Sequence, residues 1–246
     1  MTLPEVVSAD EWRAARIELL AREKEFTRAR DALSAERRRL PMTEVTEDYR
    51  FTGAGGEVGL ADLFEGRKQL LVYHFMFEPD WDAGCPSCSF TIDNVGHLSH
   101  LHARSTTLAL VSRAPYEKLA AYRTRMGWDL PWYSSYGSTF NYDFGVTYAP
   151  DKGSADYNFR DRTSDEGWVG WSGEMPGVSA FVRDGDRILR TYSVYERGID
   201  MLVGTYQWLD LTVLGRQEGW EQPPGRGEGP GMGWLHRHDE YPADQA

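Results

Sequence analysis

Two cysteines, Cys85 and Cys88, are separated by two residues and are the only cysteines in the 246-residue chain. A pair at this spacing can exchange disulfides with a substrate, form a reversible disulfide, or supply half of a metal site. It follows an apolar run at residues 70–77, whose β-branched and aromatic residues indicate a buried strand. Helical periodicity starts at the cysteines, and Pro86 suits a first helical turn. The sequence therefore predicts a strand that delivers Cys85 to a helix N-terminus, where partial positive charge favours the thiolate.

Thiol–disulfide exchange requires an exposed thiolate and a second thiol within bridging distance. We expect Cys85, at the edge of the helix, to attack the substrate, and Cys88, nearer the interior, to resolve the mixed disulfide. Three carboxylates in the preceding turn, Glu78, Asp80 and Asp82, oppose a thiolate. We therefore expect a modestly lowered pKa for Cys85 and a reducing pair, with no cofactor.

A metal site is the second interpretation of the pair, with His97, His100 and His102 as further ligands. On a continuous helix, nine residues separate Cys88 from His97, or about 13 Å along the axis. Zinc ligands lie at about 2.0–2.3 Å from the ion. These side chains therefore share an ion only if the helix breaks at Gly96, and we assign no metal ligands.

The other histidines give no stronger metal signal. His236 and His238 reach the cysteines only if the C-terminal tail folds back over them. His74 lies on the apolar strand, where we expect a core histidine with a hydrogen-bond partner rather than a base.

Composition limits the class of function. Hydrophobic residues make up 41% of the chain and charged residues 26%, which is typical of a chain that buries a substantial core. The net charge of −11 argues against nucleic acid and anionic membranes as partners, because both require basic residues. No apolar run approaches the roughly 18 residues of a membrane-spanning helix, and residues 1–12 do not resemble a secretory signal. We therefore expect a cytoplasmic location.

The N-terminal 40 residues predict one long helix. Ser8 and Glu11 match a capping box, and Pro41 ends the helical pattern near Arg39. A narrow apolar stripe repeats every seven residues, at Trp12, Leu19, Phe26, Leu33 and Leu40. We expect this stripe to pack on the chain's own domain or on a partner subunit, which makes a homodimer possible.

The remaining elements follow in an order that indicates the fold. They are a hairpin at 49–60, the strand at 70–77, the cysteine helix, a strand at 106–111, a helix at 114–126, a hairpin at 178–192 and a helix at 199–214. This is the order of a thioredoxin-like α/β three-layer sandwich. We divide the chain into an N-terminal helix at 1–40, a thioredoxin-like domain at 41–218 with an aromatic-rich insertion at 127–175, and a Gly/Pro-rich tail at 219–246.

Several motifs resemble a bacterial family of unknown function whose members are described as predicted dithiol-disulfide oxidoreductases with a thioredoxin-like fold. The resemblance extends over about residues 41–241. It implies a redox dithiol at Cys85 and Cys88, supported by Trp81, Pro86 and Ser87, that acts on a protein or small-molecule thiol or disulfide. The motifs that carry it are Tyr73-His74-Phe75-Met76-Phe77, Asp80-Trp81, Gly84-Cys85-Pro86-Ser87-Cys88-Ser89, Thr191-Tyr192-Ser193, Arg197-Gly198, Leu209-Asp210-Leu211-Thr212 and Leu214-Gly215-Arg216.

The chain departs from thioredoxins at two positions. Thioredoxins place a cis-proline before the third core strand, facing the cysteines; here Pro176 is near, but counting back from the turn puts Gly177 at that position. Trp81 precedes Cys85 by four residues instead of one.

Two further functions stay open. A peroxiredoxin-like peroxidase fits the leading hairpin, but such enzymes place Thr or Ser three residues before the reactive cysteine, where this chain has Asp82. A metal-binding or non-catalytic binding protein with a thioredoxin fold is the other alternative.

Overall fold

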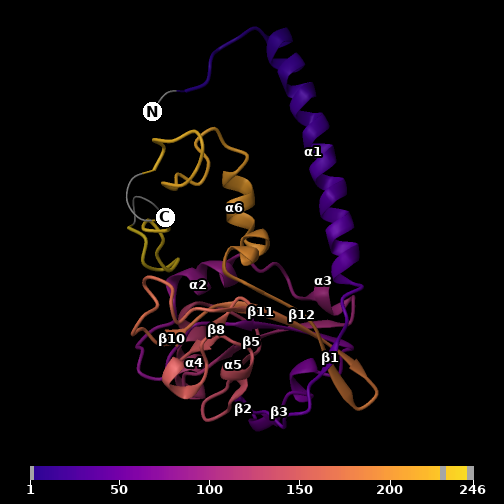
Figure 1. Cartoon of the computed structure of the whole chain (residues 1–246), viewed down its shortest axis with the longest axis vertical. Helices are drawn as coiled ribbons and strands as arrows, with labels where there is room; N and C mark the ends of the chain where they lie inside the picture. Colours follow the sequence, from indigo (N-terminus) through magenta and orange to yellow (C-terminus); the bar gives the residue numbers. More distant parts are fainter. Residues whose placement is uncertain (1–2, 228–230, 243–246) are drawn as a thin grey trace.

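A mixed β-sheet forms the centre of the fold in the computed structural model, which describes residues 3–227 and 231–242 (Figure 1). The strands lie in the spatial order β1-β12-β11-β4-β5-β6-β2-β3. In chain order they are β1 (Thr43–Glu44), β2 (Arg50–Gly53), β3 (Gly56–Gly59), β4 (Gln69–His74), β5 (Thr106–Ser112), β6 (Trp132–Ser134), β11 (Gly177–Asp184) and β12 (Arg187–Tyr195).

Strands β12, β11, β4 and β5 make the core sheet of a thioredoxin fold. β4 and β5 are parallel and are joined through α2 (Pro86–Asp93), whereas β11 is antiparallel to β4 and forms a hairpin with β12. Apolar clusters on both faces of the sheet are covered by helices and connecting segments. The chain therefore has the three-layer thioredoxin-like α/β fold, with the leading hairpin, β2 and β3, that the sequence predicts.

Alternation along β4 decides which side chains reach the site. Successive residues of a strand point to opposite faces. Leu70 and Val72 lie in one apolar cluster, whereas Leu71 and Tyr73 contact the cluster that contains Cys88. Cys88 is thus part of the core on the face that α2 covers.

The second predicted helix, α4 (Tyr116–Arg125), covers the same face as α2. It leads into β6, which pairs in parallel with β5 and so belongs to the main sheet, inside the region predicted as an insertion at 127–175. A right-handed crossover between adjacent parallel strands keeps both helices on one face. The chain reaches the opposite face through α5 (Phe140–Asp143), and Phe140 is buried in the cluster there.

A buried carboxylate holds the aromatic-rich segment to the sheet. Glu174 accepts hydrogen bonds from Arg113 at 2.9 Å, Asn141 at 2.8 Å and Thr147 at 2.7 Å. Burial raises the pKa of Glu174 above its usual value. The short elements between β3 and β11 not yet named are η1 (Asp62–Phe64), β7 (Thr147–Tyr148), η2 (Pro150–Lys152), β8 (Asp156–Tyr157), β9 (Arg160–Asp161) and β10 (Gly173–Glu174).

The helix that starts at the cysteines does not continue to the histidines. α2 ends at Asp93, and a separate helix, α3, spans Ser99–His102. Asn94 is the C-cap of α2, and its side-chain oxygen accepts hydrogen bonds from the N–H and the hydroxyl of Thr205, at 2.7 and 2.8 Å. A tertiary contact therefore ties the end of this helix to a distant part of the chain.

The last predicted helix is also shorter than its pattern. A 3₁₀ helix, η3 (Glu196–Leu202), precedes α6 (Gly204–Leu209). Of the tail beyond it, residues 231–242 lie beside α2 (Figure 1). Trp234 packs edge to face on Phe90 with ring centroids 5.8 Å apart, and Leu235 is buried. Part of the predicted tail, residues 228–230 and 243–246, lies outside the described residues.

The N-terminal helix, α1 (Ala9–Arg37), projects away from the sheet (Figure 1). The predicted capping box of Ser8 and Glu11 is confirmed. None of the helix is buried, and Trp12 and Phe26 are 62% and 69% exposed, so the prediction that the stripe packs on its own domain is wrong. Packing on a partner subunit stays a prediction. Across the described part of the chain, no helix combines the length and apolar character needed to cross a bilayer.

Candidate dithiol site

The connection from β4 to α2 positions the first cysteine. The N–H of Cys85 donates to the carbonyl of Met76 at 3.0 Å, which folds the intervening loop back on the strand end. Cys85 is the residue that caps α2, and Pro86 occupies the first turn as predicted. The carbonyl of Cys85 accepts from the N–H of Ser89 at 2.9 Å and from its hydroxyl at 2.8 Å. The thiol is thereby held at the helix N-terminus and is only partly buried.

Gly84 allows the loop to approach the core. A Cβ added at Gly84 would lie 2.6 Å from the ring of Phe75 and 2.8 Å from the ring of Tyr122. Real Cβ atoms do not approach other atoms this closely, so the position admits glycine alone without a shift of these rings. The tight turn before Cys85 therefore depends on a residue without a side chain.

The two thiols have opposite electrostatic environments. Hydrogen bonds lower the pKa of Cys85 to about 6; the largest effect comes from the Cys88 thiol, and the N–H groups of Cys88 and Ser87 add to it against the cost of burial. Cys88 is 1% exposed, and burial raises its pKa well above the usual value. Both thiols are free in this structure. The arrangement gives one thiolate and one protonated thiol near neutral pH.

The lowered pKa of Cys85 is a larger shift than the modest one predicted from the acidic turn. The carboxylate of Glu78 accepts a hydrogen bond from the N–H of Glu174 at 3.2 Å, and it is not among the groups that chiefly shift the pKa of Cys85. Neither Asp80 nor Asp82 is among the groups that chiefly shift the pKa of Cys85. Local hydrogen bonds at the helix start therefore outweigh the nearby charges.

Two groups at the end of β4 contact the buried thiol; both residues belong to the motif at 73–77, but the sequence assigned neither of them a role at the site. The N–H of Met76 donates to the Cys88 sulfur at 3.4 Å. The hydroxyl of Tyr73 hydrogen-bonds to Cys88 and lowers its pKa against the effect of burial. Tyr73 alternates as an ordinary core residue, and its hydroxyl, together with its place in the motif at 73–77, is the signal that could have marked it.

The supporting residues predicted from the sequence lie around the pair in different ways. Trp81 and Pro86 line a groove of about 460 Å³ beside Cys85. Pro176 lines a second cleft, of about 470 Å³, together with both cysteines and Ser87. Gly177 faces the other way, since a Cβ there would meet the ring of Tyr195 at 2.7 Å. The counting argument that put Gly177 at the cysteines is therefore wrong about position, and Pro176 occupies that wall.

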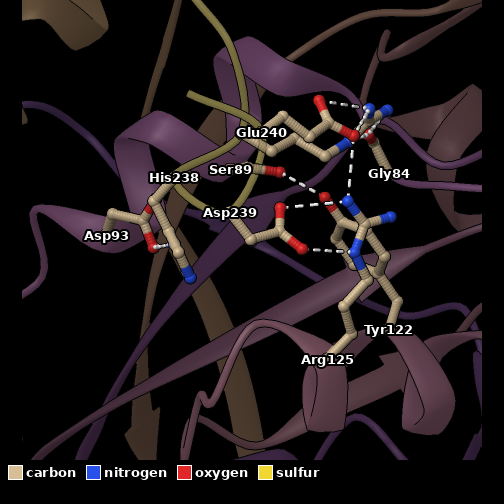
Figure 2. A network of polar contacts seen from close by, with 9 residues as sticks. Gly84, Ser89, Asp93, Tyr122, Arg125, His238, Asp239 and Glu240 are labelled. Atoms are coloured by element: carbon tan, nitrogen blue, oxygen red, sulfur yellow. Dashed lines mark hydrogen bonds and ion pairs between the residues drawn. The ribbon is translucent and has the colours of Figure 1, made fainter. Parts of the chain in front are cut away.

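The tail returns to the site, as Figure 2 shows. Arg237 donates two hydrogen bonds to the carbonyl of Gly84, at 2.9 and 2.6 Å. His238 lies 2.9 Å from the carboxylate of Asp93 at the end of α2. Two further tail residues, Asp239 and Glu240, pair with Arg125 of α4. Contacts across about 150 residues of sequence leave no local pattern, so the residues that this tail would contact could not be predicted from the sequence.

The histidines that were considered as metal ligands do not contact the cysteine thiols. His238 contacts Asp93 rather than a thiol, and His97 binds the hydroxyl of Ser99 at 2.8 Å. Among residues 3–227 and 231–242, no three His, Cys, Asp or Glu side chains gather as a metal site would require. His74 is buried with its Nε2 2.9 Å from the Ser179 hydroxyl, and its pKa is lowered to about 3 by burial and the charge of Arg190. It is therefore a neutral core residue, as predicted.

Comparison with known proteins gives a family. The model of the family described as "Bacterial protein of unknown function (DUF899)" matches residues 1–241, so the chain belongs to this family. Among curated proteins, none matches.

Several solved structures that resemble the chain are peroxiredoxins. Peroxiredoxin Q of Xanthomonas campestris is 11% identical, with 68% of this chain and 96% of that chain covered and a TM-score of 0.44. The peroxidoxin BcpB of Mycobacterium tuberculosis is 18% identical, with 66% and 94% covered and a TM-score of 0.42. Peroxiredoxin 6 of Arenicola marina is 12% identical, with 69% and 74% covered and a TM-score of 0.43. Their activities are not carried over to this chain.

The pKa of Cys85 gives a pH test. Because the thiolate reacts and the thiol does not, alkylation of the reduced protein by iodoacetamide should rise with a midpoint near pH 6 and level off above about pH 7. Rates from pH 4 to 10, with the labelled residue identified by mass spectrometry, measure this profile. The Cys85→Ser variant is the control and should lose the fast phase. A single midpoint near pH 9 would contradict the geometry.

Proposed function

We propose that this member of the DUF899 family is a thiol–disulfide oxidoreductase in which Cys85 attacks and Cys88 resolves. The observation that supports it most is the pairing of a stabilised thiolate, Cys85, with a buried thiol of raised pKa at the start of one helix. Thiol exchange needs an attacking thiolate and a second thiol that stays protonated until the first has reacted.

The exchange takes place in two balanced steps. The Cys85 thiolate attacks one sulfur of a substrate disulfide; the substrate S–S bond breaks, and one half leaves as a thiolate that takes up a proton. Cys88 then loses its proton and attacks the Cys85 sulfur, so that the mixed disulfide breaks and the second half leaves as a thiol. The substrate gains two electrons and the dithiol becomes a disulfide, which a low-molecular-weight thiol reduces again.

Five other residues have supporting roles in this proposal. Pro86 and Ser87 build the helix start, and the N–H of Ser87 binds the Cys85 sulfur. Trp81 forms a wall beside the attacking thiol. Pro176 gives the cleft an apolar side, and its carbonyl accepts from a tyrosine hydroxyl at 2.8 Å instead of facing the substrate. Gly177 lets β11 pack under a tyrosine ring.

Disulfide exchange fits the site better than peroxide reduction. Asp82, three residues before Cys85, lines the same groove as the thiol and presents a carboxylate, which accepts hydrogen bonds but does not donate them when ionised. A peroxidase of the peroxiredoxin type needs a donor there. We place the exchange in the cytoplasm, where cellular thiols can re-reduce the pair.

Cysteine variants separate the two steps. With 4,4′-dithiodipyridine as substrate, the wild-type protein should release two equivalents of thiopyridone per protein molecule. Cys88→Ser should release one and retain a mixed disulfide at Cys85, because nothing resolves it. Cys85→Ser should show no fast release, since the buried thiol is protonated. Absorbance and intact mass measure these products, and equal release from both variants would refute the assigned roles.

The hydroxyl of Tyr73 should speed the second step alone. Tyr73→Phe removes the hydrogen bond that lowers the pKa of Cys88, so the second release should slow by about three- to tenfold while the first is unchanged. Stopped-flow absorbance resolves the two phases. The matched control is Tyr136→Phe, which removes a hydroxyl from an exposed residue and should alter neither phase. An unchanged second phase in Tyr73→Phe would remove the hydroxyl from the mechanism.

A further inference from the structure

The cleft above the two cysteines has the character of a binding site for an apolar group. It measures about 470 Å³, within the range of about 300–1,000 Å³ that small organic ligands occupy. Its walls come from the end of β4, from α2, from η3 and α6, and from the tail. Apolar and aromatic side chains dominate these walls, including Met76, Phe90, Ile199, Val203 and Met232.

The charged residues at the cleft are already paired within the protein. Glu196 accepts hydrogen bonds from Arg162 and Asn158. Arg197 lies 3.3 Å from Asp200 and stacks over an indole ring. Asp200 pairs with Arg216 as well, so each of these charges already has an opposite partner, although Arg197 stays exposed to solvent. The cleft therefore favours an uncharged substituent.

The tail restricts the size of what reaches the thiols. Arg237 binds the residue before Cys85, and His238 binds Asp93 at the other end of α2 (Figure 2). Met232, from the same segment, forms part of the cleft wall. Trp234 packs on Phe90 of α2. The segment 231–242 thus lies along α2, where the surface of a folded protein would have to dock to present a disulfide to Cys85.

We propose that the substrate is a low-molecular-weight disulfide with uncharged, apolar substituents, one of which occupies this cleft, and that residues 231–242 keep protein disulfides out. This substrate proposal rests on the proposed function, because it assumes the disulfide exchange by Cys85 and Cys88. The apolar half remains bound as the mixed disulfide at Cys85 until Cys88 attacks the Cys85 sulfur and releases it as a thiol.

Matched reagents test the substrate class. Two aromatic disulfides differ in charge: 4,4′-dithiodipyridine is neutral and 5,5′-dithiobis(2-nitrobenzoate) is dianionic. Each rate is divided by the rate of the same reagent with a free low-molecular-weight thiol, which removes intrinsic reactivity. The neutral reagent should be favoured at least tenfold, and insulin disulfides should be reduced at least a hundredfold more slowly. A ratio near one for either comparison overturns the proposal.

Variants locate the preference in the cleft. Met232→Glu places a carboxylate in the cleft wall and should remove most of the tenfold preference, whereas Met201→Glu, the same change on an exposed residue of η3 outside the cleft, should keep it. Deletion of residues 231–246 should raise insulin reduction at least tenfold. Circular dichroism checks that each variant is folded. Equal preference in both Glu variants overturns the cleft as the binding site.

The rate of iodoacetamide alkylation on its pH plateau separates two kinds of failure. A reactive Cys85 that exchanges with all reagents equally contradicts only the substrate class. A slow thiol that exchanges with none contradicts the proposed function as well.

Discussion

The close contact of Gly84 with the aromatic core is the constraint on which the site depends. No side chain fits between this backbone and the rings of Phe75 and Tyr122. The Gly84 carbonyl is the anchor for Arg237, and the next N–H is tied to Met76. The loop, the helix start and the tail therefore meet at one peptide, and the position of Cys85 follows from it.

The position of Cys85 explains why the two thiols differ in pKa, and no charged partner is needed for this difference. Cys85 sits where helix N–H groups and the Cys88 thiol favour its ionised form, and Cys88 sits one turn deeper, where burial disfavours ionisation. Neighbouring groups with divergent pKa values mark acid–base roles in catalytic sites. This difference agrees with the order of the proposed exchange, in which the outer thiolate reacts first and the inner thiol second.

Sequence patterns predicted the parts of this site that are local. The motif at a helix N-terminus, the capping box at Ser8 and the β11–β12 hairpin all depend on residues close in the chain. What they missed is tertiary. β6 is three residues within an aromatic run, too short to show a period, and Asn94 at the end of α2 binds Thr205, 111 residues away. The Gly/Pro-rich composition of the tail did not indicate the ion pairs that it forms with Arg125 of α4.

The reduction potential of the Cys85–Cys88 pair tests the central claim most directly. A lowered pKa stabilises the reduced form, so the pair should be more oxidising than the acidic turn suggests. Equilibration with glutathione buffers should show a reversible two-electron transition between about −270 mV, the value for thioredoxin, and about −120 mV, the value for a strongly oxidising dithiol protein. Two results would contradict the account: a pair that forms no disulfide at any glutathione ratio, or a disulfide that glutathione buffers cannot reduce.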